Sequence, residues 1–242
     1  MKKAFLRYLA YVALVALTAY GITRVPYIVP GGLWLDVAGQ SGATSEFSPI
    51  EQLQHACLLA CALIFCWIAS RDRLRRPMAM GWASLFTLFL IRELDYVFDT
   101  YVVDNLWQVL FAVVLAFAAV YLFRNRNRFF TGWRRSWPSA GLGMVLGGLL
   151  LLVPFTQIVV SNQLWSAVMD EHYVRPAKIA AEELMELGAY LIILIGSVEF
   201  LYSWSRLPQT KLIGALPKKR TYRRKSKRKK VARKKVPSKR AG

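Results

Sequence analysis

The chain has 242 residues, of which 55% are hydrophobic, and its mean hydropathy is +0.32. These values exclude an ordinary soluble domain, because the apolar residues come in blocks of about 18 to 25 and roughly 20 such residues cross a bilayer. The formal net charge of +19 is unevenly placed. Residues 218–242 hold 15 of the 33 Lys and Arg and no acid, which leaves 18 basic against 14 acidic residues, or +4, in the rest.

The apolar runs predict an all-α fold, a polytopic transmembrane helical bundle of about six spans. The expected spans are 5–23, 51–70, 78–97, 106–123, 139–160 and 180–204. Together they form a predicted membrane domain, 1–211, followed by a disordered basic cytoplasmic tail, 212–242. Lys2 and Lys3 before the first run, with Ala19 and Gly21 after it, leave a cleaved signal sequence as the alternative to a retained first span.

The basic residues predict the orientation, because Lys and Arg are retained on the cytoplasmic side. Of the 18 basic residues before the tail, 14 lie at the N-terminus, in the connections around 71–76 and 124–135, or after the last span. We therefore expect a multi-pass protein of the cell inner membrane with both termini in the cytoplasm. Loops 24–50, 98–105 and 161–179 should then lie outside.

The predicted fifth span has a pattern typical of close helix packing. Gly143 and Gly147 stand four residues apart with Ser139 in the same register, which gives a small-xxx-small face. We expect this face to pack inside the bundle, with a homodimer through Gly143 and Gly147 as the alternative. Pro154 should bend the outer half of the same helix.

Acidic residues gather on the opposite side from the basic ones. Twelve of the 14 map to the outer half or the outer loops, a bias that the placement of basic residues does not explain, since acids contribute little to topology. Several lie inside apolar segments of three different spans, where ionisable groups normally turn toward protein or water. We expect eight side chains to converge near the outer face, with Arg92 as the central cation. They are Glu51, His55, Arg92, Glu93, Asp95, Glu182, Glu183 and Glu186.

Helical spacing supports this grouping. Glu51 and His55 are four residues apart, Glu182 and Glu186 are also four apart, and both pairs therefore share a helix face. A similar face is predicted for the third span by the spacing of Arg92, Asp95 and Asp99. Four further polar residues at this depth should complete the hydrogen bonding: Gln54, Asn105, Gln157 and Tyr190.

Several kinds of chemistry fit such a cluster. As catalytic candidates, His55 with Glu51 could act as acid and base and Arg92 could hold a phosphate or carboxylate, so the site could bind or process a periplasmic or lipid-linked substrate. The alternatives are a non-catalytic scaffold or assembly protein and a proton- or cation-coupled transporter. An equally weighted alternative is that the cluster has no ligand and is a polar network that only fixes the register of the helices in the bundle. The sequence has no strong catalytic motif and does not decide whether the protein is an enzyme.

We assign no cofactor and no metal. The chain has two histidines, His55 and His172, and His172 lies in a polar outer loop. The predicted partners are the lipid bilayer and, through residues 218–242, anionic lipid head groups. Non-specific nucleic acid is the alternative partner of that segment, although its one aromatic residue, Tyr222, offers little base stacking.

Overall fold

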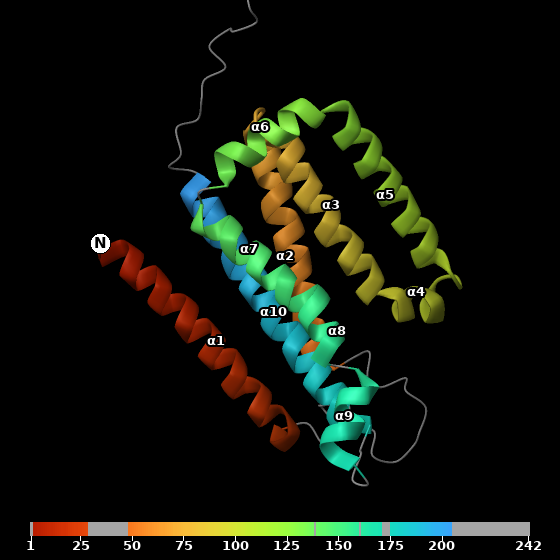
Figure 1. Cartoon of the computed structure of the whole chain (residues 1–242). Helices are drawn as coiled ribbons and strands as arrows, with labels where there is room; N and C mark the ends of the chain where they lie inside the picture. The colour runs from red at the N-terminus through yellow and green to blue at the C-terminus, as the bar shows by residue number, and fades with distance from the viewer. Residues whose placement is uncertain (1, 29–47, 138, 160, 171–174, 205–242) are drawn as a thin grey trace, which may run out of the picture. The chain divides into compact units, whose positions relative to one another are not determined.

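The computed structural model describes residues 2–28, 48–137, 139–159, 161–170 and 175–204, and all regular structure in these ranges is helical (Figure 1). The elements are α1 (Lys2–Ile28), α2 (Pro49–Arg71), α3 (Arg76–Glu93), α4 (Asp95–Tyr101), α5 (Leu106–Arg124), α6 (Arg126–Ser136), α7 (Ala140–Leu150), the π-helix η2 (Leu151–Phe155), α8 (Thr156–Val159), α9 (Asn162–Met169) and α10 (Arg175–Trp204). The predicted all-helical class is confirmed. The predicted tail lies outside the described residues.

Four of these helices are long and apolar enough to cross a membrane, which supports a membrane protein. They are Ala4–Arg24, Pro49–Arg71, Leu106–Arg124 and Lys178–Trp204, and the bent pair of α6 with α7 and η2 makes a fifth if it is counted as one span. The predicted third span, 78–97, covers most of α3 but runs past its end at Glu93 into α4, and the 18 residues of α3 carry Arg76 at one end and Arg92 and Glu93 at the other. Because those charges lower its apolar character, the total of six spans stays a prediction.

The bundle is built around α2, α3, α7 and α10. Helix α10 packs along α7 and α2, while α3 packs between α2 and α5 (Figure 1). Three fully buried phenylalanines, Phe65, Phe86 and Phe200, meet in the core, where the Phe65 ring lies 5.7 Å from each of the other two rings. One aromatic layer therefore joins α2, α3 and α10.

Glycines set the close contact between α7 and α10. Gly141 and Gly148 of α7 face Gly196, Ile193 and neighbouring backbone of α10. The sequence identified the wrong face for this contact, because Cβ atoms added at Gly143 and Gly147 would meet nothing within 4 Å. The homodimer through these two residues stays a prediction.

The connection between the predicted fourth and fifth spans is helical. Gly132 of α6 is buried against α3, and Trp133 stacks on Trp82 at 5.8 Å, while Arg128 and Arg134 remain exposed. A helix with aromatic residues on one side and arginines on the other is typical of a membrane interface. Helix α6 meets the following helix at 105°.

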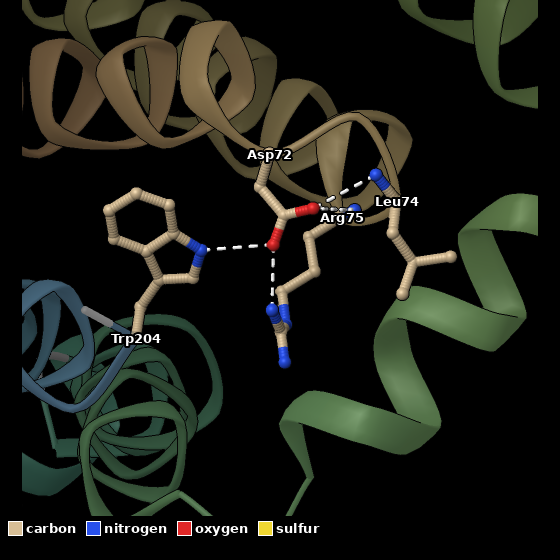
Figure 2. A network of polar contacts seen from close by, with 4 residues as sticks. All are labelled: Asp72, Leu74, Arg75 and Trp204. Carbon is tan, nitrogen blue, oxygen red and sulfur yellow. Dashed lines mark hydrogen bonds and ion pairs between the residues drawn. The ribbon is translucent and has the colours of Figure 1, made fainter. Parts of the chain in front are cut away.

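A capped turn joins α2 to α3 and ties it to the end of α10 (Figure 2). Asp72 accepts hydrogen bonds from the backbone N–H groups of Leu74 and Arg75 at 2.9 and 3.1 Å, from Arg75 Nη1 at 2.6 Å and from Trp204 Nε1 at 3.0 Å. Partial burial of the carboxyl opposes its ionisation. The hydrogen bonds from Trp204 and Arg75, with the charge of Arg75, outweigh that effect and hold the pKa of Asp72 below its usual value.

Candidate functional site

A cavity of about 190 Å³ lies at the end of the bundle away from Asp72. Its wall consists of the eight residues that the sequence groups together: Glu51, His55, Arg92, Glu93, Asp95, Glu182, Glu183 and Glu186. The structure therefore brings all eight together from α2, α3, α4 and α10. Whether any of them is catalytic stays a prediction.

Local structure places each group at the cavity. Ser48 caps α2 by accepting a hydrogen bond from the backbone N–H of Glu51 at 3.2 Å, which fixes the start of the helix one turn before His55. Glu182 and Glu186 lie one turn apart on α10. The third helix is interrupted, since α3 ends at Glu93 and α4 begins at Asp95.

That interruption corrects one predicted feature. Arg92, Asp95 and Asp99 were expected on one continuous helix face, but the break at Leu94 separates Arg92 from the other two. Asp99 does not belong to the cavity wall. Its carboxylate accepts a hydrogen bond from the backbone N–H of Asn105 at 2.8 Å, so neither of these residues contributes to the site.

Glu93 links three helices. Its backbone carbonyl accepts a hydrogen bond from His55 Nε2 at 3.1 Å, and its Oε1 accepts one from the Tyr190 hydroxyl at 3.0 Å. The contact with the carbonyl requires the Nε2 proton, so Nδ1 of a neutral His55 is the acceptor nitrogen. Tyr190 therefore completes the hydrogen bonding of the site, as the sequence predicts.

Gln54 forms a second link behind the cavity. Its side chain is fully buried, and Nε2 donates to both the backbone carbonyl and Oε2 of Glu183, at 3.1 and 3.0 Å. Its Oε1 is a buried acceptor that receives no hydrogen bond from the described part of the chain. Gln54 thus fixes Glu183 against α2. The side chain of Gln157, the remaining predicted partner, lies outside the described residues.

Negative charge dominates the cavity. Its wall contains six carboxyl groups, one guanidinium and one imidazole. Arg92 is exposed, whereas the other seven residues are partly buried. Among the described side chains the structure records two salt bridges, Arg7 with Glu199 and Arg75 with Asp72. Neither involves Arg92, so no ion pair among these residues supports its predicted role as the central cation.

The side chains in the cavity wall limit the kinds of ligand that it can bind. Within the described ranges, no group of three or more His, Cys, Asp or Glu side chains is arranged to hold a metal ion. The site offers carboxylate oxygens, a histidine and one exposed guanidinium around a small volume. Such a wall presents mainly hydrogen-bond acceptors, and a ligand that fits it supplies donors and positive charge.

A separate polar network lies near the other end of α10. Arg7 of α1 pairs with Glu199 through Nε to Oε2 at 2.6 Å and Nη2 to Oε1 at 2.7 Å, and the Tyr11 hydroxyl donates to Oε2 at 3.0 Å. The Arg7 guanidinium also lies 3.9 Å from the centre of the Tyr202 ring. This network attaches α1 to α10 and was not predicted, although each member is an isolated polar residue in an apolar run.

Comparisons with protein-family models, curated proteins and solved structures gave no significant match, so the site's geometry carries the functional argument.

Proposed function

We propose that this protein is a multi-pass inner-membrane protein whose eight-residue cavity faces the outside and binds a cationic group, such as a primary ammonium. The observation that carries this proposal is the composition of the cavity wall, with six carboxyl groups against one guanidinium. In this orientation both termini are cytoplasmic, as the basic connections predict.

Electrostatics favours a cation over an anion. Two unit charges 4 Å apart interact with about 1 kcal/mol in water and about 4 kcal/mol at an effective dielectric constant of ~20. Six carboxyl groups therefore attract an ammonium even when some are protonated, and they repel a phosphate or carboxylate. The exposed Arg92 alone does not reverse this balance. A lipid-linked phosphate substrate consequently fits the cavity less well than an amine.

Hydrogen bonding points the same way. The Glu93 carboxylate in the cavity wall is an acceptor, as are the other five carboxyl groups when they are ionised, and an ammonium brings up to three N–H donors. The network from Tyr190 and His55 to Glu93 holds the wall in place before a ligand arrives, which lowers the ordering cost of binding.

The interior of the bundle favours a one-sided site over a transport pathway. Phe65, Phe86 and Phe200 fill the core between the cavity and the opposite end, and Glu199 there is already bound by Arg7 and Tyr11. A proton or cation crossing the membrane would need polar groups along this route. The proposal is therefore a binding site open to one side.

The basic segment 218–242 is proposed to bind anionic lipid head groups of the cytoplasmic leaflet. Its 15 basic residues support this, since each one near such a surface contributes about 1 kcal/mol before screening. This contact would hold the C-terminus at the cytoplasmic face of the membrane.

Binding to the full-length protein in neutral-lipid nanodiscs tests the cavity proposal. Butylammonium and butyrate are similar in size and opposite in charge, so calorimetric titration should detect the first and not the second. Glu182→Gln, which removes one wall charge, should weaken butylammonium binding by about three- to tenfold. Asp104→Asn makes the same charge change at an exposed residue outside the wall and serves as the matched control. Equal binding of the two ions, or equal loss in both variants, would overturn the proposal.

A further inference from the structure

A second cavity of about 190 Å³ adjoins the polar one. It is lined by Phe89, Arg92, Leu152, Val153, Glu186 and Tyr190, from α3, η2 and α10. Arg92 and Glu186 belong to both walls, so the two cavities meet across these two side chains. The second cavity therefore lies beside the polar one, and its remaining wall is apolar and aromatic.

A π-helix that contains a proline supplies part of the wall of this second cavity. Pro154 lacks an N–H and crowds the preceding turn, and residues Leu151–Phe155 form a π-helix. The Leu151 carbonyl accepts hydrogen bonds from both the backbone N–H and, at 2.9 Å, the hydroxyl of Thr156, which holds the widened turn together. Leu152 is buried against the bundle, whereas Val153 is exposed and lines the opening.

The position of the opening indicates what enters it. Val153 and Phe155 are exposed on a helix that, together with α6 and α7, makes a fifth candidate span when the bent pair is counted as one, so in a bilayer this side of the cavity would face lipid. An alkyl chain that enters this cavity leaves water for an apolar wall, and an ammonium joined to the chain can reach the carboxylates beside Glu186. A polyamine, with charges along its whole length, would place a cation beside Phe89 and Leu152.

We propose that the ligand of this protein is an amphipathic amine whose ammonium lies among the carboxylates and whose alkyl chain occupies the cavity of Phe89, Leu152 and Val153. This inference rests on the proposed cation site and adds the ligand's apolar part. The affinity should rise with chain length by up to about fourfold per methylene, which corresponds to ~0.8 kcal/mol for each buried CH₂. The rise should stop when the cavity is filled.

The test is a titration of the full-length protein in neutral-lipid nanodiscs with ethyl-, butyl- and hexylammonium. Empty nanodiscs measure partition into lipid, which is subtracted. Val153→Trp fills the opening with a bulky side chain, and Val153→Phe does so with a smaller one in case the first variant loses stability. Val113→Trp is the matched control, because Val113 is also an exposed valine and lies on α5 outside both cavities.

The proposal expects affinity to rise from ethyl- to hexylammonium in the wild type and in Val113→Trp, and to stay flat in the Val153 variants. If all three amines bind with equal affinity to the wild type, the chain site is refuted while the cation site stands. If the rise persists in both Val153 variants, the chain lies elsewhere and the inference is also refuted. If no amine binds, the proposed function itself fails.

Discussion

Replacing Gly141 by alanine should separate α7 from α10. A Cβ at this position would clash with the backbone nitrogen of Phe200 and would lie 2.6 Å from the Phe200 Cα and 2.7 Å from the carbonyl oxygen of Gly196. These atoms belong to the backbone of α10, so no side-chain rotation relieves the contact. The two helices must move apart along the tightest part of their interface.

The size of the effect follows from two opposing contributions. Overpacking a tight interior costs typically 1–3 kcal/mol, and the contact here is at the severe end because backbone meets backbone. Alanine has a helix propensity higher than that of glycine by about 1 kcal/mol, which offsets part of the cost. We expect Gly141→Ala to be destabilised by about 1–2 kcal/mol overall.

Gly143→Ala provides the control two residues away on the same helix. A Cβ at Gly143 would meet nothing within 4 Å, so this variant keeps the propensity gain without the contact. Thermal unfolding in one detergent should place the Tm of Gly141→Ala several degrees below that of Gly143→Ala, since about 1 kcal/mol shifts Tm by ~2–4 °C at this size. Equal Tm values for the two variants would refute the close approach of α7 and α10.

Three further predictions concern other parts of the chain. Arg7→Gln or Glu199→Gln alone should cost about 1–3 kcal/mol because each leaves a buried charge without its partner, and the double variant should cost less than the sum; additive losses of Tm would contradict the pairing. The lowered pKa of Asp72 stabilises the fold above the ordinary aspartate pKa of ~3.9, and this contribution is lost as the pH falls through the folded pKa. Trp204→Phe removes one hydrogen bond to that carboxylate, so in melts recorded from pH ~5 to ~2 its loss of stability should begin at a higher pH than in the wild type, and coincident profiles would count against this contact. A peptide of residues 218–242 should float with anionic but not neutral vesicles at low salt, and equal recovery would rule out the lipid proposal.

The cavity could be predicted from sequence because burial constrains charge strongly. Glu51, Glu93 and Glu186 lie at similar depth in three apolar runs. Because turning any of them toward lipid costs free energy, we expected them to face one another in a shared site. The spacing of Glu182 and Glu186 on one helix face needed no tertiary information. The hydrogen bond from Tyr190 followed from the same depth argument.

Other features depend on how the helices break and pack, which the spacing of residues along the sequence does not show. The break at Leu94 moves Asp99 away from the cavity, and the apolar run around it shows no proline or glycine to mark it. The small-xxx-small spacing indicated the helix face of Gly143 and Gly147, whereas Gly141 and Gly148, which face α10, do not have that spacing and could not be identified by it. Pro154 predicted a bend, but the π-helix and the cavity beside it depend on the helices packed around it.

Labelling of a single cysteine from outside the cell tests the central claim most directly. The exposed Cys66 is first replaced by alanine, and Cys57 and Cys61 are buried. A membrane-impermeant thiol reagent added to intact cells should then label Glu182→Cys in the cavity wall, and butylammonium should slow that labelling. Ser70→Cys, exposed at the opposite end of α2, should be labelled only after the membrane is opened. Labelling of position 70 and not 182 in intact cells, or labelling of 182 at a rate that butylammonium does not change, would contradict an outward-facing cation site.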